Sequence, residues 1–283
     1  MTIAGVLRDE IFSPNSNDLR IMQLVSENLQ GQGRTILLYT EKEFLRNDIH
    51  AHIVFSMARH TATLDKLQVL ESQGTLVVNP PAGVRHCHRI EITQALLRQG
   101  LSVPRNVFFD LSQEVTLPED IPFPCWLKRA DTYTLTKDDV CFIHNQAALS
   151  NHLADFIKRN IKTAVVSRHI KGDLIKFYGV SKTSFFHWHY PTLNIHGEKF
   201  GLEKLNGPVR HYPFSPDKLK ADMTLLAETL QVPVYGGDCI VDNEGNCQFI
   251  DFNDWPSFSV CAEEASQAIG EYINSLIRSS VTA

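Results

Sequence analysis

Two carboxylates and an amide occupy chemically suggestive positions near the end of the sequence. Residues 235–253 read YGGDCIVDNEGNCQFIDFN, and DNEG is a turn signal between two apolar runs, so the stretch predicts a β-hairpin. Because strand side chains alternate, Asp251 and Asn253 should share one face with Phe249. The fold-back places Asp238 roughly opposite Asp251. Oxygen ligands of this kind suit Mg²⁺, usually together with phosphate, so the pattern indicates a metal site with a nucleotide nearby.

Two lysines stand in apolar strands, where a bound anion would explain them. Lys128 lies in FPCWLKRAD, at the end of the apolar strand, and Lys176 lies between Ile175 and Phe177. Removing an ammonium group from water is costly unless it meets an anion, and a nucleotide phosphate would suit Lys128. A mid-strand lysine such as Lys176 can point into a cleft. The alternative is that both stems pack while the charged heads reach water.

His187 and His189 form a third pattern, because they share one face of the strand FFHWHYP. Two histidines at this spacing can bind a metal or an anion, or they can form the hydrogen-bonded face of an amphipathic strand. The acidic strand also has a plainer alternative. It can be a strand that runs into a turn, with Ile250 and Phe252 on its other face.

Composition narrows the classes of protein. The chain has 283 residues, is 43% hydrophobic and carries a net charge of -5, as expected of a globular enzyme and not of a general nucleic-acid binder. No apolar run reaches the length of a membrane span, and the first residues do not resemble a signal peptide. The six cysteines are scattered without a C-x-x-C pair, which favours reduced thiols in a cytoplasmic protein.

The first eighty residues alternate between strand and helix patterns, which predicts a small α/β domain with a parallel sheet. No G-x-G-x-x-G motif is present, so a dinucleotide site of the Rossmann type is not expected. Pro80, Pro81 and Gly83 mark a boundary. Strands are predicted at 3–8, 35–40, 52–57 and 75–81, and helices at 17–30 and 63–74.

The rest of the sequence reads as a helix followed by a β-rich region. RHCHRIEITQALLRQGLSVP (85–104) has the pattern of one amphipathic helix that stops at Gly100. Mostly antiparallel strands interrupted by helices then predict an α+β arrangement. Strands are predicted near 124–129, 139–144, 163–170, 173–179, 184–190, 237–242 and 247–252, and helices near 146–159, 215–230 and 260–277.

Taken in order, these pieces resemble an ATP-grasp enzyme. The resemblance covers most of the chain, from VVNPP to DWPSF, whereas the N-terminal part matches in style only. It implies the ATP-grasp fold with an N-terminal Rossmann-like domain, in a chain of mixed α/β and α+β class. The implied division is an N-terminal domain at 1–82, a central subdomain at 83–170, and a C-terminal subdomain with the metal site at 171–283.

The resemblance also implies that the cofactors are ATP and Mg²⁺, and it assigns roles to residues. Lys128 matches the family's lysine that contacts the ATP phosphates, and Arg89 stands where a basic residue often reaches ATP. The segment VVSRHIKGD resembles the hinge whose backbone reads the adenine. The implied nucleotide contacts are Arg89, Lys128, Ser167, Arg168, His169, Ile170 and Lys176, and the implied Mg²⁺ ligands are Asp238, Asp251 and Asn253.

Two departures from the family's ligases bear on the reaction. Residues 128–145 contain no glycine where ligases have a Gly-rich loop, and Asp251 stands where ligases usually carry Glu. Both features look more like the inositol phosphate kinases of the same fold. The expected reaction is transfer of the γ-phosphoryl group from Mg-ATP to a small-molecule acceptor. A carboxylate–amine ligase acting through an acyl phosphate is the alternative, and a non-catalytic nucleotide-binding regulator is the second alternative.

The acceptor is expected to be anionic, without a nucleic-acid or membrane partner. The densest group of Lys, Arg and His in the chain lies between residues 171 and 211, and cationic groups gather in clefts where an anion is held. Lys176 and Arg210 are the predicted catalytic residues, and His189 is a further predicted contact. Basic residues of the segment include Lys171, Lys176, Lys182, His187, His189, Lys199, Lys204, Arg210 and His211.

Overall fold

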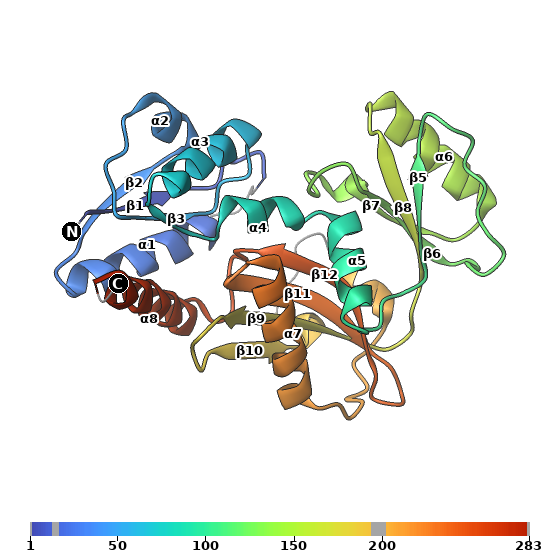
Figure 1. The fold of residues 1–283 in the computed structure, drawn as a ribbon. Helices are drawn as coiled ribbons and strands as arrows, with labels where there is room; N and C mark the ends of the chain where they lie inside the picture. The colour runs from blue at the N-terminus through green and yellow to red at the C-terminus, as the bar shows by residue number, and fades with distance from the viewer. Residues whose placement is uncertain (1, 13–16, 194–201, 282–283) are drawn as a thin grey trace.

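The computed structural model describes residues 2–12, 17–193 and 202–281, which form three four-stranded sheets with helices packed on them (Figure 1). Residues 2–78 contribute the first sheet, 106–168 the second and 173–254 the third. Each sheet lies within one of the three ranges expected from the sequence. The boundaries at 82 and 170 stay predictions.

The first sheet is wholly parallel, as the alternation of strands and helices predicted. Its elements are β1 (Thr2–Val6), α1 (Asn17–Gly31), β2 (Thr35–Tyr39), α2 (Glu41–Arg46), β3 (Ile53–Ser56), α3 (Thr61–Ser72) and β4 (Leu76–Val78). The strand order is β2-β1-β3-β4, so β1 and β3 lie in the middle. Both central strands are almost wholly buried, whereas the edge strand β2 is largely exposed.

The second sheet is antiparallel and has a core of its own. Its elements are β5 (Asn106–Asp110), β6 (Cys125–Arg129), the 3₁₀ turn η1 (Lys137–Asp139), β7 (Val140–Ile143), α6 (Gln146–Lys158) and β8 (Thr163–Arg168). The strand order is β5-β8-β6-β7. Leu149, Leu153 and Phe156 recur at helical spacing on α6 and pack with Leu127 and Val166 of the sheet.

The third sheet is also antiparallel, in the order β10-β9-β11-β12. Its segment comprises β9 (Asp173–Val180), β10 (Phe186–His189), the 3₁₀ turns η2 (Pro191–Leu193) and η3 (Leu202–Asn206), α7 (Pro216–Leu230), β11 (Val234–Val241), β12 (Cys247–Asp254) and α8 (Ala262–Val281). Apolar residues of α7, such as Met223 and Leu226, pack against Phe177 and Phe252 on one face of the sheet. The antiparallel pairing of β11 with β12 confirms the predicted hairpin.

The largest core cluster joins the two ends of the described chain. α8 lies beside α1 (Figure 1), and Met22 and Val25 of α1 share a cluster with Ile269 of α8. The amide Nδ2 of Asn28 donates to Ser266 Oγ at 2.8 Å across the same contact. Buried residues of β9 and β11 belong to this cluster as well. The first and third sheets are therefore parts of one packed unit, while the second sheet stands on its own core.

The structure corrects the sequence prediction at three elements. The helix predicted from residue 85 is two helices, α4 (Pro81–His86) and α5 (Arg89–Arg98), because the backbone of His88 is extended at φ -94° and ψ 150°. The helix α2 was not predicted, although Thr40 and Glu43 form a capping box at its start. The strand β5 was also missed, since it is short and only half-buried.

The cysteines and helices agree with the expectations from composition. All six cysteines are free thiols, five of them buried and Cys247 half-buried, so they pack as reduced side chains. In the described part of the chain, no helix combines the length and the apolar character that a membrane crossing requires.

Candidate functional site

The third sheet carries a row of polar side chains across all four of its strands. The register pairs His189 of β10 with Lys176 of β9. Lys176 in turn pairs with Asp238 of β11, and Asp238 pairs with Asp251 of β12. Side chains of directly paired residues lie on the same face of a sheet, so these form a continuous line. The predicted opposition of Asp238 and Asp251 is therefore confirmed.

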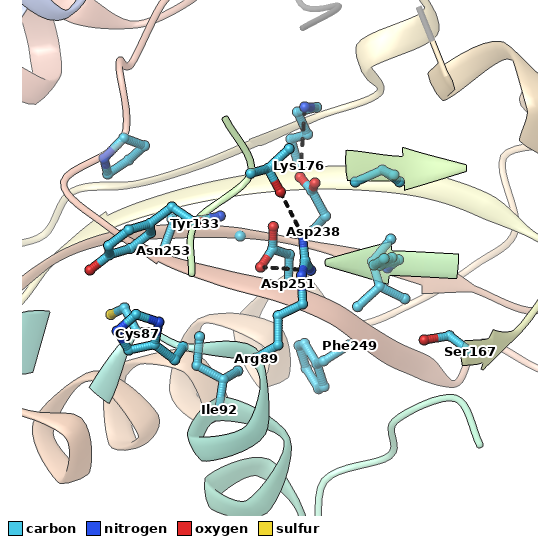
Figure 2. A pocket seen from close by; sticks show the side chains of 18 of the residues that line it. Cys87, Arg89, Ile92, Tyr133, Ser167, Lys176, Asp238, Phe249, Asp251 and Asn253 are labelled. Carbon is cyan, nitrogen blue, oxygen red and sulfur yellow. Dashed lines mark hydrogen bonds and ion pairs between the residues drawn. The ribbon is translucent and has the colours of Figure 1, made fainter. Parts of the chain in front are cut away.

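The row borders a cavity that lies between the three sheets. Its volume is about 350 Å³, within the range of small-molecule sites. The walls include Arg59 from the N-terminal part, Lys128 and Ser167 from the second sheet, and Asp238 and Asp251 from the third. Figure 2 shows Lys176 and Asp238 above Asp251, and Arg89 reaching toward Asp251 from the helix below. Residues of all three parts of the chain thus meet around these carboxylates.

Lys128 lines the cavity at the end of β6, as its position in the sequence predicted. No hydrogen bond or ion pair among the described residues uses its Nζ atom. Burial and the positive charge of Arg89 together lower the pKa of Lys128 to about 8, against the opposing effect of Asp251 and Asp238. A half-buried ammonium group that has no acceptor among the described residues is a group that an incoming anion would stabilise.

Lys176 occupies a different environment, between two acids. Its Nζ lies 3.4 Å from Glu203 Oε1 and 3.9 Å from Asp238 Oδ1. Burial lowers the pKa of Lys176, but Asp238 and Glu203 outweigh that effect and leave it above its ordinary value. Lys176 is thus held as a cation at the edge of the carboxylate pair.

Arg89 is fixed in place by the strand segment that follows Lys128. Its Nε donates to the carbonyl oxygen of Arg129 at 3.0 Å, and its Nη2 donates to Thr134 Oγ1 at 2.8 Å. Its Nη1 lies 3.9 Å from Asp251 Oδ1 (Figure 2). The break between α4 and α5 places Arg89 in the first helical residue of α5, from which it reaches the cavity.

The predicted hinge residues divide into two groups. Ser167, Arg168 and Ile170 line the cavity. His169 does not line it, and its Nδ1 accepts a hydrogen bond from Trp126 Nε1 at 3.1 Å. Among the described residues, no backbone hydrogen bond involves His169 or Ile170, so their amide and carbonyl groups are available to a ligand.

Asp238, Asp251 and Asn253 provide the donor set that the sequence predicted for Mg²⁺. Burial raises the pKa of Asp238, and Asp251 adds to this rise against the effect of Lys176. Two facing carboxylates and an amide fit a hard cation, which would relieve their repulsion. In the part of the chain that the structure describes, no group of three or more His, Cys, Asp or Glu side chains is arranged for a metal, and the role of Asn253 as a ligand stays a prediction.

A β-bulge in β12 shapes this donor set and corrects one expectation. After the pair Asp238–Asp251 the register shifts by one residue, which leaves Ile250 unpaired. Phe249 therefore packs in the same core cluster as Phe252 and does not share the face of Asp251, as simple alternation had predicted. The bulge lets the strand bury both phenylalanines while Asp251 still faces Asp238.

The structure does not bring Arg210 to the other predicted residues. Arg210 lies outside the lining of the cavity, and its Nη1 donates to the hydroxyl of Tyr212 at 2.9 Å. The backbone amides of both residues donate to Asp173, which fixes this loop at the start of β9. Lys199, another member of the basic segment, lies outside the described residues.

His189 is buried beside Lys176 but does not line the cavity. Neither of its ring nitrogens has a hydrogen-bond partner among the described residues. Burial, together with the charges of His187 and Lys176, lowers its pKa to about 4. His187 stacks on Tyr178 instead of joining His189 at a metal. The contact of His189 with an acceptor stays a prediction.

Sequence reasoning missed much of the cavity wall, including the charged and aromatic residues Arg8, Arg59, Tyr133 and Asp254. Asp254 is 1% exposed, and its Oδ1 accepts a hydrogen bond from Arg59 Nη2 at 2.8 Å. The guanidinium of Arg59 lies over the ring of Tyr133, 4.0 Å from its centroid. One feature of the sequence could have pointed to the two arginines, because each follows shortly after an apolar strand, at residues 8 and 59.

Comparison with known proteins identifies the architecture. No family model matches the sequence, and no curated protein matches it significantly. Among solved structures, the chain is similar to a RimK domain ATP-grasp protein from Sphaerobacter thermophilus, with 15% identity, a TM-score of 0.70, and 96% of this chain and 99% of that chain covered. It is also similar to D-alanine–D-alanine ligase from Bacillus anthracis in complex with ATP, with 14% identity, a TM-score of 0.70 and 98% of each chain covered. The chain has the ATP-grasp fold.

A third ATP-grasp likeness is the VanG D-Ala:D-Ser ligase from Enterococcus faecalis, with 12% identity, a TM-score of 0.67, and 96% of this chain and 99% of that chain covered. The alignments extend over the N-terminal part, which the sequence had matched in style only. They show the ATP-grasp fold and do not separate its branches, so the likeness to inositol phosphate kinases stays a prediction. The roles of the individual site residues stay predictions as well.

Proposed function

We propose that the chain binds Mg-ATP in this cavity and transfers the γ-phosphoryl group to an oxygen of an anionic small molecule. The observation that carries the proposal is the meeting of Lys128, Asp238, Asp251 and Asn253 around one cavity of an ATP-grasp fold. Lys128, which has no acceptor in the described part of the chain, lines this cavity together with two carboxylates and an amide. This is the arrangement that a metal-bound triphosphate requires.

The site residues would have separate roles toward the metal, the phosphates and the adenine. Asp238, Asp251 and Asn253 would hold Mg²⁺, which neutralises charge on the phosphates. Lys128 and Arg89 would contact the phosphates, and the backbone of the 167–170 hinge would contact the adenine. The acceptor oxygen forms a new bond to the γ-phosphorus, the bond from that phosphorus to the bridging oxygen breaks, and ADP leaves. Catalysis would be mainly positioning and electrostatic stabilisation.

Two acceptor chemistries have support. The ligases among the structural neighbours favour a carboxylate acceptor, which would form an acyl phosphate and then an amide with release of phosphate. The Gly-free segment 128–145 favours the kinase alternative, in which phosphate remains on the product. We place the carboxylate–amine ligase first, because these neighbours share the whole architecture, including the N-terminal sheet.

The fate of phosphate separates these alternatives. The protein is incubated with Mg-ATP and fractionated metabolites, and products are followed by ³¹P NMR and mass spectrometry. Released phosphate together with a new amide supports the ligase, and retained phosphate supports the kinase. ATP binding without turnover would indicate a nucleotide-binding regulator. Absence of ATP binding by calorimetry would overturn the whole proposal.

The lowered pKa of Lys128 should make the affinity for ATP depend on pH. Its protonated form binds phosphate, and its pKa of about 8 means that the free protein loses this charge as the pH rises through 8. We expect the affinity for ATP to be nearly constant below pH 7 and to fall about fivefold between pH 8 and pH 9. Calorimetric titrations with ATP at several pH values measure this.

Lys128→Met provides the matching variant. Loss of a charge-assisted hydrogen bond of about 1.5–3 kcal/mol should weaken ATP binding roughly 10- to 100-fold at pH 7 and remove the step near pH 8. Lys158→Met on the exposed side of α6 is the control and should bind ATP as the wild type does. Unchanged affinity in Lys128→Met would mean that Lys128 does not contact the nucleotide.

A further inference from the structure

Two arginines lie at the carboxyl ends of the central strands of the first sheet. Arg8 follows β1 by two residues and Arg59 follows β3 by three, and β1 and β3 are neighbours in the sheet. The strand order β2-β1-β3-β4 makes this pair the topological switch point, since the chain leaves β1 toward one edge and β3 toward the other. In open parallel sheets, ligands bind in the crevice outside the carboxyl ends of the strands at such a point.

The guanidinium group of Arg8 is hydrogen-bonded within the protein through all of its nitrogens. Its Nε donates to the carbonyl oxygen of Met57 at 3.2 Å, and its Nη1 donates to Asp18 Oδ2 at 3.1 Å. Its Nη2 donates to the carbonyl oxygen of Trp255 at 2.8 Å. All three guanidinium nitrogens therefore have acceptors, and Arg8 serves to hold the crevice together.

Among the described residues, the guanidinium group of Arg59 is hydrogen-bonded through Nε and Nη2 but not through Nη1. Its Nε and Nη2 both donate to the carboxylate of Asp254, at 3.4 Å and 2.8 Å. No hydrogen bond among the described residues uses Nη1, although the side chain is only 7% exposed and lines the cavity. Among the described residues, the two N–H groups of Nη1 therefore have no acceptor, and they are available to a ligand in the cavity that Arg59 lines.

Other contacts fix the direction of this free nitrogen. The ring of Tyr133 covers the guanidinium face at 4.0 Å, and the Tyr133 hydroxyl donates to the carbonyl oxygen of Val84 at 3.0 Å. Burial lowers the pKa of Arg59, but the carboxylate of Asp254 more than offsets this, so the group stays cationic. A cation held by an aromatic face and a carboxylate is a preorganised donor for a planar or tetrahedral oxyanion.

We propose that Arg59 is a specificity-determining residue that binds the anionic group of the acceptor, a carboxylate or a phosphate, at the switch point of the first sheet. The inference rests on the proposed function and names its acceptor subsite. Asp254 and Asp251 belong to the same strand, three residues apart, which spans about 10 Å. The anionic group and the reacting oxygen of the acceptor therefore lie on the order of 10 Å apart or less, which fits a molecule of amino-acid or dipeptide size.

The test uses the full chain with the γ-phosphate position occupied by Mg-AMP-PNP. The saturated protein is titrated separately with inorganic phosphate and with succinate, so the two arms distinguish a phosphate from a carboxylate subsite. We expect the wild type to bind at least one of these anions, and Arg59→Gln to bind that anion at least about tenfold more weakly. Arg105→Gln, an exposed arginine outside the cavity, should match the wild type.

Arg59→Lys provides a second test if the glutamine variant does not fold, because lysine keeps a positive charge opposite Asp254. It loses the fork geometry, so the anion should again bind at least about tenfold more weakly. Equal anion affinity in the wild type and in either folded Arg59 variant would overturn the inference, as would absence of anion binding by the wild type. Failure of the wild type to bind Mg-AMP-PNP would instead count against the proposed function.

Discussion

Asp251→Ala is expected to lower ATP turnover at least about 100-fold while the protein remains folded. Altering a residue that merely orients a metal ligand costs 10- to 100-fold in many proteins, and loss of a ligand itself should exceed that. The side chain of Asp251 is 30% exposed and faces a cavity, so its removal takes little from the core. Turnover and the melting temperature should be measured on the same preparation.

The matched control for Asp251→Ala is Glu271→Gln, which removes an exposed carboxylate of α8 far from the row of site residues. Titration of ATP binding with Mg²⁺ adds a readout that does not depend on turnover. The Mg²⁺ requirement should rise in Asp251→Ala and stay unchanged in Glu271→Gln. Full activity in Asp251→Ala, or loss of its fold, would argue against the metal assignment.

Asp254→Ala is expected to destabilise the protein by about 3–5 kcal/mol. Asp254 is 1% exposed and accepts from Arg59 at 2.8 Å, and its Oδ2 lies 3.5 Å from Arg8 Nη2. Removing one partner of a buried pair leaves an uncompensated charge in the interior, and that accounts for the size of the loss. The free energy of unfolding is measured by urea denaturation.

Asp120→Ala provides the contrast for Asp254→Ala. Its partner is Arg105, and both side chains are at least half exposed, so the loss should be no more than about 1 kcal/mol. If Asp254→Ala loses no more stability than Asp120→Ala, the buried network does not hold the N-terminal sheet to β12.

The parts of the site that sequence reasoning located depend on local signals. Asp238 and Asp251 face one another because a short turn joins two apolar strands, and both the turn and the strands can be read from neighbouring residues. Lys128 was found because a charge at the end of an apolar run is unusual. The bulge at Ile250 could not be found in this way, since it depends on how β12 packs both Phe249 and Phe252.

The residues that were missed depend on contacts between distant segments. Arg59 and Asp254 are 195 residues apart, and nothing near either residue in the sequence marks the other as its partner. The opposite error occurred at Arg210, where many basic residues in one segment suggested a cleft. The structure turns the guanidinium of Arg210 to Tyr212 at the surface, because backbone contacts with Asp173 set the loop. Charge density along a sequence does not define a surface in space.

The packing of α8 on α1 has a consequence for synthesis on the ribosome. The apolar face of α1, with Met22 and Val25, is covered by a helix made some 240 residues later. Until residues 262–281 have been translated, the nascent N-terminal sheet carries an uncovered apolar surface, and such surfaces favour chaperone binding and aggregation. The second sheet meets no such delay, because its core is complete within residues 106–168. The middle of this chain should therefore be the first part to reach its native state, ahead of the segment that is made before it.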